Sequence, residues 1–238
     1  MRCSPTLTGS SGHAAISPWA ARSSMQHWWL RPSSATPPEK DAIKTGKTAR
    51  EIWPDEPARA AQKDTDAHWT LKFAKAKPTP DGRPGIDIAI PSFGYKSSVS
   101  ICRTYGFIRK CKVTDGARFD GRMLRDVVTS DNTASEVWAD TAYRSQVNEA
   151  WLKRQGRVSR IHRKKPRGKP MPERTAKANA AKSKIRPRVE HIFARQKDQM
   201  GLFIRIIGIK RAEAKITLAN LAYNMHRLIF HERRAATG

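Results

Sequence analysis

From residue 95 onward, strand-like and helix-like segments alternate along the chain, and this alternation constrains the fold more than any other feature. Residues 95–103 and 107–114 have strand composition and are joined by Thr104-Tyr105-Gly106, a length suited to an antiparallel hairpin. The segments that follow are a helix at 120–129, a strand at 136–139, a helix at 145–155, a strand at 158–162 and a long helix at 173–199. Such alternation implies parallel strand pairing, so the sequence predicts an α/β fold, with a mixed sheet flanked by helices.

The two ends of the alternating region are predicted differently. A last helix over residues 212–232 carries apolar side chains that we expect to pack on the sheet, namely Ile216, Leu218, Ala219, Leu221, Ala222, Met225, Leu228 and Ile229. Upstream, residues 39–66 are polar and interrupted by prolines, with a short helix near 38–48. Residues 69–73 and 86–90 have strand-like patterns that fit either a hairpin or a loop.

Basic residues dominate the charge of this chain. The formal net charge is +25 over 238 residues, and residues 153–188 contain fifteen Lys or Arg but a single acid, Glu173. More than half of the net charge therefore lies in this segment. So strong a local excess favours a polyanionic partner, and above all nucleic acid. The alternative is a solvated basic loop with no partner.

Cysteine usage and hydropathy restrict the class of protein further. The three cysteines, Cys3, Cys102 and Cys111, are odd in number and lack the paired spacing of a zinc site or a disulfide framework. This usage fits a reducing cytoplasm. The sequence contains no run of about eighteen apolar residues, so we expect no transmembrane span.

One acidic residue stands out by its position. Asp140 follows the apolar run Val137-Trp138-Ala139 directly. In open α/β sheets, ligand sites gather at the carboxyl ends of parallel strands, so Asp140 is a candidate site residue. A turn-forming or helix-capping aspartate ahead of Tyr143 would give the same pattern, and both interpretations stay open.

A second group of candidate residues lies on the predicted long helix. Arg186, Glu190 and Lys197 are spaced by four and seven residues, so they project from one face of the helix. The apolar residues Val189, Phe193 and Met200 lie on the neighbouring arc and would pack on the sheet. An ordinary surface salt bridge between Arg186 and Glu190 is the alternative. Pro187 would break or kink a helix that begins at Glu173, unless a new helix starts there.

Taken together, these residues resemble the DDE transposases of bacterial insertion sequences. Asp140-Thr141-Ala142-Tyr143-Arg144 resembles the motif of the second catalytic Asp, with Ala142 where Gly is common. The third motif is matched by Arg186, Glu190 and Lys197, with Ser183 where many relatives carry Tyr. Residues 159–164 and 220–225 also resemble sequence segments of this family. The resemblance extends from about Lys40 to the C-terminus.

The resemblance implies an RNase H-like catalytic domain with a two-metal site, in which three carboxylates hold Mg²⁺ at a scissile phosphodiester. Asp140 and Glu190 would be metal ligands, and Arg186 and Lys197 would act beside them near the cleaved strand. The partner would be double-stranded DNA, both transposon ends and target, in the bacterial cytoplasm at the nucleoid; a homo-oligomer is left open. The DNA-binding residues would be Arg144, Arg163, Lys164, Lys165, Arg167, Lys169 and Arg188.

The family's first catalytic Asp has no counterpart in this sequence. In the family this Asp lies on the first strand of the sheet, upstream of a segment that resembles residues 39–44. Residues 1–38 of this chain contain no Asp or Glu. Asp87 has apolar neighbours but does not match the family order. Asp64, Asp66, Asp115 and Asp120 are expected to cap helices or form turns, and Asp120 to be the N-cap of the helix at 120–129.

This gap defines the expected organisation and activity. We expect a non-homologous or disordered segment at 1–38, a linker and partial N-terminal part of the catalytic domain at 39–94, and an RNase H-like catalytic domain at 95–238 that lacks its first strand. The expected function is that of a DDE transposase fragment, with an incomplete Mg²⁺ site and no activity of its own. Two alternatives are a non-catalytic basic DNA-binding protein and a transposase remnant that does not fold stably.

Overall fold

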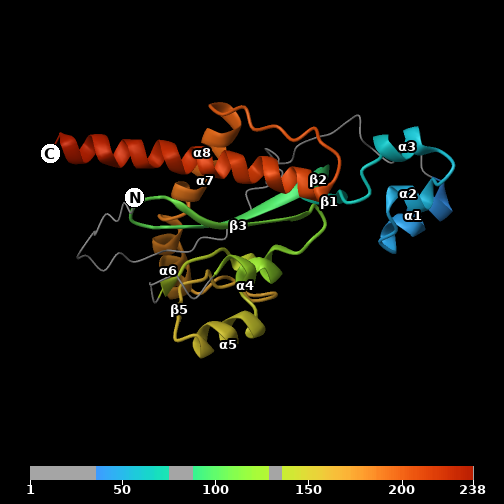
Figure 1. Cartoon of the computed structure of the whole chain (residues 1–238). Helices are drawn as coiled ribbons and strands as arrows, with labels where there is room; N and C mark the ends of the chain where they lie inside the picture. The colour runs from blue at the N-terminus through green and yellow to red at the C-terminus, as the bar shows by residue number, and fades with distance from the viewer. Residues whose placement is uncertain (1–35, 75–87, 129–135, 238) are drawn as a thin grey trace, which may run out of the picture.

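The computed structural model describes residues 36–74, 88–128 and 136–237. Most of the segment 1–38 lies outside these ranges, and so does Asp87. Figure 1 shows a mixed arrangement of helices and strands, which confirms the predicted α/β class. None of the described helices is long and apolar enough to cross a membrane.

The larger sheet is antiparallel and contains β1 (His68–Ala74), β2 (Ile88–Ile101) and β3 (Ile108–Asp115), in that order. The hairpin predicted between 95–103 and 107–114 is confirmed, with Tyr95 opposite Asp115. Residues 68–74 pair with 88–94, so the uncertain upstream segments form a hairpin and not a loop.

The predicted strands at 86–90 and 95–103 are one continuous strand in the structure, β2. Pro91 lies inside it, opposite Leu71. A proline lacks the backbone N–H and is tolerated where one edge of a strand needs no donor. At this position β1 is the one described neighbour of β2, so the proline ring does not interrupt the strand.

A second, smaller sheet pairs β4 (Glu136–Val137) with β5 (Val158–Ser159) in parallel, which confirms the parallel pairing expected of the alternating region. Both strands are shorter than predicted. The ladder nevertheless continues past them, because Arg160 N donates to Val137 O at 2.8 Å and His162 N donates to Ala139 O at 3.1 Å. The connection contains the 3-10 turn η3 (Thr141–Tyr143) and helix α5 (Gln146–Arg154).

The two sheets have open edges that face no described strand. Residues 92–101 of β2 are buried on both faces, as in the central strand of a sheet. Among the described strands, however, residues 95–101 pair with β3 alone, and β4 pairs with β5 alone. The described part of the chain therefore carries two sheet fragments, and their open edges include residues 95–101 of β2 and the outer side of β4.

Helices lie on both faces of the larger sheet (Figure 1). On one face is η2 (Asp120–Met123) followed by α4 (Leu124–Val127), where the sequence predicted a single helix over 120–129. The prediction that Asp120 is the N-cap is wrong, because Phe119 occupies that position. The Asp120 carboxylate instead lies 3.3 Å from the ammonium of the buried Lys96.

The predicted long helix at 173–199 consists of two helices, α6 (Glu173–Ser183) and α7 (Pro187–Asp198). Pro187 is the first residue of α7, where its missing N–H removes no hydrogen bond and its fixed φ suits a helix start. Val189 and Ile192 of α7 pack against Val99, Ile101 and Ile108 of the sheet.

The last helix, α8 (Ile209–Ala236), lies along the same face as α7 and extends past the end of the sheet (Figure 1). Four side chains of α8 itself are buried, those of Ala212, Ile216, Ala219 and Tyr223. The expectation that all its apolar residues pack on the sheet is wrong, because a second set is exposed on the opposite side: Leu218, Leu221, Met225, Leu228 and Ile229.

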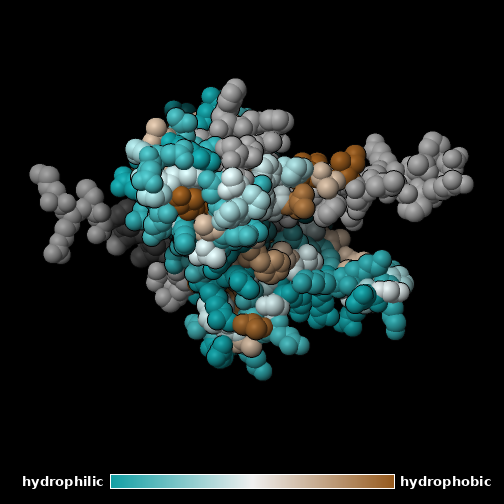
Figure 2. Space-filling model, turned by 90° about the vertical axis from the view of Figure 1, so that its right-hand side faces the viewer, coloured by the Kyte–Doolittle hydropathy of each residue, from teal (hydrophilic) through white to brown (hydrophobic). Residues whose placement is uncertain are grey.

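Three short helices precede the larger sheet: α1 (Pro37–Lys44), α2 (Ala49–Ile52) and α3 (Pro57–Gln62). They share a small core of Ile43, Trp53 and Ala60 and lie at one end of the molecule (Figure 1). Figure 2 shows this side of the molecule, which is mostly hydrophilic, with apolar side chains in small separate patches.

Candidate functional site

Asp140 lies at the carboxyl end of β4, where the sequence placed it. It is the N-cap of η3, and its Oδ1 accepts hydrogen bonds from Thr141 N at 2.6 Å and Thr141 Oγ1 at 3.2 Å. The capping role and the strand-end position therefore occur together. The side chain is partly exposed, and none of the described residues donates a hydrogen bond to its second oxygen, Oδ2. That oxygen is free to bind a ligand.

Buried contacts fix the backbone on both sides of Asp140. Ala139 is buried, and its carbonyl accepts from His162 N. Tyr143 is buried in the cluster that surrounds β4 and β5. The Asn148 side-chain amide donates to Tyr143 O and Gly121 O, each at 2.8 Å, which ties the turn to η2. The carboxylate is therefore presented from a rigid frame.

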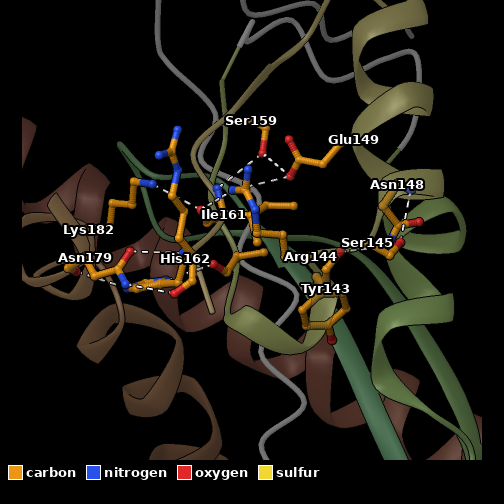
Figure 3. A network of polar contacts seen from close by, with 12 residues as sticks. Tyr143, Arg144, Ser145, Asn148, Glu149, Ser159, Ile161, His162, Asn179 and Lys182 are labelled. Carbon is orange, nitrogen blue, oxygen red and sulfur yellow. Dashed lines mark hydrogen bonds and ion pairs between the residues drawn. The ribbon is translucent and has the colours of Figure 1, made fainter. Parts of the chain in front are cut away.

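His162 connects this turn to helix α6 (Figure 3). Its Nδ1 lies 2.9 Å from Ala139 O, and its Nε2 lies 3.1 Å from Asn179 O and 3.0 Å from Ser183 Oγ. Ser183 is the last residue of α6, and α7 begins four residues later. One buried imidazole thus joins the neighbour of Asp140 to the helix end that precedes Arg186 and Glu190.

Two cations converge on one carbonyl beside this histidine. Arg144 Nη1 and Lys182 Nζ each donate to Ile161 O at 3.1 Å (Figure 3). Partial burial lowers the pKa of Lys182, and the nearby guanidinium groups of Arg144, Arg163 and Arg160 lower it further. Glu149, 3.5 Å from Arg144, is the acid that opposes this effect. The cluster keeps excess positive charge that an anion could neutralise.

The three predicted residues of the helix face are all exposed on or beside α7. Arg186 Nε donates to Glu190 Oε1 at 2.6 Å, so the alternative salt bridge is present. Lys197 lies two turns further along the helix. Val189 is buried, and Phe193 and Met200 pack against the same cluster, as the sequence predicted. The apolar arc thus holds Glu190 at the surface near the sheet.

The basic residues predicted to bind DNA differ in their environment. Arg163, Lys164, Lys165, Arg167 and Lys169 form an exposed run between β5 and α6. Its start is fixed, because Asn179 bonds both the N–H and the carbonyl of Arg163 at 3.1 and 3.0 Å. Arg188 donates to Arg103 O, and Arg144 is held inside the fold as described above. Five exposed cations therefore face solvent from an anchored loop.

Within the described ranges, the predicted carboxylates are not joined by a third donor. Nowhere in the described ranges do three His, Cys, Asp or Glu side chains lie together as a metal-binding group. Asp140 and Glu190 supply the hard oxygen atoms that Mg²⁺ prefers. Two carboxylates, one of them already paired with Arg186, are fewer than the three that the resemblance implies.

Other acidic residues have structural roles. Asp64 is buried and accepts from Tyr95 Oη at 2.7 Å and from the backbone of Asp66 and Ala67, and Asp66 accepts from Ile209 N at 2.9 Å. Asp115 caps the turn that follows β3 by accepting from Ala117 N and Arg118 N, both at 2.9 Å. The expectation that Asp64, Asp66 and Asp115 cap helices or form turns is confirmed.

Sequence reasoning missed the roles of His162 and Lys182. Both are distant in sequence from Asp140, and their contacts depend on α6 crossing the end of β5. The family-like text at 220–225 gave a clearer signal. Asn220 Oδ1 accepts from Gln196 Nε2 of α7 at 2.8 Å, and Asn224 bonds both backbone groups of Ile108 at 2.8 Å. These two residues join α8 to α7 and to β3.

Comparison with known proteins identifies the family of this chain. The sequence model of the family described as "Transposase DDE domain" matches residues 68–225, more than half of the chain. No curated protein matches the chain. The matched region contains both sheets, the turn with Asp140 and helix α7 with Glu190. This chain therefore belongs to the DDE transposase domain family.

Proposed function

We propose that this chain is a DNA-binding portion of an insertion-sequence DDE transposase that does not cleave DNA by itself. The observation that carries the proposal is the pair of open sheet edges at β2 and β4, with Asp140 at the end of β4. A strand between these edges would unite the fragments into one RNase H-like sheet. It would also bring a third carboxylate beside Asp140.

The residues present define what the chain contributes. Asp140 offers one carboxylate oxygen to a ligand, and Glu190 offers a second carboxylate balanced by Arg186. Mg²⁺, when bound to a complete trio, would supply Lewis-acid activation of the phosphodiester. Because the described carboxylates do not complete that trio, no hydrolytic step is assigned to this chain.

DNA binding is supported by the distribution of charge. The exposed run of residues 163–169 lies next to the cationic cluster of Arg144, Lys182 and Arg160. Lys and Arg side chains that neutralise phosphates release counterions, so affinity falls steeply with salt. We propose that the duplex backbone lies along this run, with Lys197 and Arg188 on the α7 side. The DNA would be that of the bacterial nucleoid.

Cleavage assays test the lack of activity. The purified chain with Mg²⁺ and DNA that ends in the element's terminal repeats should leave the ends intact. Robust end cleavage that disappears in Asp140→Asn would overturn this part of the proposal. If a frameshift upstream of the matched region explains the missing first Asp, translation of the DNA upstream of Glu39 in the two other frames should show an apolar run that contains Asp.

Binding assays test the role of the basic run. The variant Arg163→Ala/Lys164→Ala/Lys165→Ala should bind a random DNA duplex more weakly, with a log–log salt slope smaller by about 3 if all three residues contact phosphates. The matched control is Lys40→Ala/Lys44→Ala/Lys47→Ala, which removes the same charge from exposed positions near α1. Equal losses in the two variants would show that net charge alone drives binding.

A non-catalytic DNA-binding protein is the second candidate, favoured by the Arg186–Glu190 salt bridge, which needs no metal. It predicts that DNA binding is unchanged by Asp140→Asn and by Glu190→Gln. The two candidates are separated by supplying the missing strand, in a fusion that encodes the upstream Asp-containing run. Mg²⁺-dependent cleavage by the fusion, lost in Asp140→Asn, supports the transposase candidate.

A further inference from the structure

A cavity lies between α7 and α8, on a side of α7 that faces away from Glu190. Its volume is about 420 Å³, which is within the range of ligand pockets. At about 100° per residue, His191 and Arg195 of the lining project from α7 roughly 100° and 140° round the helix from Glu190. The cavity therefore opens on a different side of the helix from the candidate site of Asp140 and Glu190.

Positive charge dominates the lining of this cavity. Arg195 of α7 and Arg227 of α8 contribute two guanidinium groups, and the exposed His191 lies on the same face of α7 as Arg195. Asp198 is the acidic residue of the lining, and within the described ranges no ion pair joins it to either arginine. Two guanidinium groups outweigh one carboxylate, so the cavity attracts an anion.

The guanidinium of Arg227 is held in place without any ligand. Its Nε and Nη2 donate to Tyr105 O at 3.0 and 2.6 Å, and its Cζ lies 4.8 Å from the centre of the Phe230 ring. Gly106 leaves room for it, since a Cβ at this position would lie 3.3 Å from both of these nitrogen atoms. No described residue accepts from Nη1 of Arg227. This third nitrogen can therefore donate to a ligand at little cost in side-chain entropy.

Tyr223 brings a buried donor to the same cavity. It is 6% exposed and lines the cavity from α8. Burial raises the pKa of its phenol, and Arg227 and Arg195 lie close enough to oppose this rise. The phenol therefore keeps its proton at neutral pH. Among the described residues, none forms a hydrogen bond with this hydroxyl, and a ligand oxygen would remove the cost of leaving a buried donor unpaired.

We propose that this cavity is a phosphate-binding site, in which Arg195, Arg227 and the Tyr223 hydroxyl hold one phosphate group. Guanidinium groups pair with carboxylates and phosphates alike. A tetrahedral phosphate has oxygen atoms in more than one plane, which suits donors that come from two different helices. A phosphate of the DNA backbone and a small phosphorylated molecule both supply this group.

Inorganic phosphate is the probe for the site itself. The full chain, with ¹⁵N-labelled arginine, is titrated with phosphate at constant ionic strength and without DNA. The Nε–H resonance of Arg195, assigned by its absence from Arg195→Gln, should shift and saturate. Tyr223→Phe should weaken binding about tenfold, the effect of one hydrogen bond to a charged group. An Arg195 resonance that does not saturate, or a Tyr223→Phe variant with the affinity of the wild type, contradicts the proposal.

A matched control separates a defined site from diffuse charge. Arg195→Gln removes one positive charge from the cavity, and Arg234→Gln removes one from the exposed end of α8. Phosphate affinity, followed at the Nε–H resonance of Arg227, should fall about tenfold in the first variant and by less than about twofold in the second. Equal losses would overturn the proposal. If thermal melts showed that Arg195→Gln is unfolded, Tyr223→Phe, which keeps the aromatic ring, would decide.

Duplex binding by the same Tyr223→Phe variant distinguishes the two sources of the phosphate group. The variant leaves the net charge unchanged, so it does not alter general attraction to DNA. If a backbone phosphate occupies the cavity, Tyr223→Phe should bind a DNA duplex several-fold more weakly than the wild type. If the ligand is a small phosphorylated molecule, duplex affinity should equal that of the wild type while phosphate affinity is still lost. The phosphate titration contains no DNA, so its result is independent of the proposed transposase role.

Discussion

At the scale of single residues, the Asp64 carboxylate is a buried acceptor of several hydrogen bonds. It is 2% exposed and accepts hydrogen bonds from Tyr95 Oη, Asp66 N, Ala67 N and Gly208 N. Asp64→Ala should lower the free energy of unfolding by about 3 kcal/mol, since several buried donors lose their acceptor. Urea titration measures this loss, and a change below about 1 kcal/mol would contradict the buried role.

Tyr95 gives a pH-dependent counterpart. Burial raises the pKa of Tyr95, and the adjacent Asp64 carboxylate raises it further. A phenol whose pKa is raised in the folded state stabilises the fold below its unfolded pKa near 10, and this contribution falls as pH rises above that value. The stability of the wild type should therefore decline more steeply above pH 10 than that of Tyr95→Phe. Parallel declines in thermal melts of the two proteins would exclude this assignment.

Lys182 makes a prediction about DNA binding. Partial burial and three nearby arginines lower the pKa of Lys182, so this side chain should lose its proton at a lower pH than a fully solvated lysine would. Affinity of the wild type for a DNA duplex should then decrease between neutral pH and pH 10 earlier than that of Lys182→Arg, which keeps its charge. Fluorescence anisotropy at constant ionic strength compares the two. Superimposable pH curves would show that Lys182 does not contact the DNA.

At the scale of secondary-structure elements, helix α5 depends on its N-cap. Ser145 Oγ accepts from Asn148 N at 3.1 Å. Ser145→Ala should cost about 1 kcal/mol of stability, whereas Ser145→Asp should cost little because it caps equally well. Chemical denaturation of the two variants tests the difference. If Ser145→Asp were as destabilising as Ser145→Ala, lost packing and not the lost cap would be the cause.

Which elements the sequence could predict depended on how local their determinants are. The hairpin of β2 and β3 and the helix at 146–154 follow from neighbouring residues, so they were predictable. The separation of α6 from α7 was indicated by Pro187, although its effect depends on where the preceding helix ends. The exposure of Leu218 on α8 was not predictable, because Leu218 and Ile216 have similar hydropathy and only the position of the sheet distinguishes them.

The candidate site divides in the same way. Asp140 and the shared face of Glu190 and Lys197 follow from strand-end position and helical spacing. The His162 bridge requires knowing that α6 passes the end of β5, a contact between residues 17 and 21 positions apart. The convergence of Arg144 and Lys182 on Ile161 O is a tertiary feature of the same kind, with no periodic signal in the sequence.

At the scale of the whole molecule, the two sheet fragments should differ in local stability. Seven residue pairs join β2 to β3, whereas two join β4 to β5. Hydrogen exchange should therefore release the amides of Arg160 and His162 well before those of Lys96 and Ser98, which face β3. A cooperative thermal transition would accompany this pattern and argue against an unfolded remnant. Equal protection of both ladders would indicate that the fragments open as one unit.

The contacts of α8 also set the order in which this protein can be completed during synthesis. Asp64 bonds to Gly208, 144 residues later, and the hairpin tip at Tyr105 O is bound by Arg227 and His231. A ribosome that has translated the described strands, up to Ser159, has not yet made the helix that covers the larger sheet. The core of this protein therefore closes only after α8 emerges, and the nascent sheet needs protection until then.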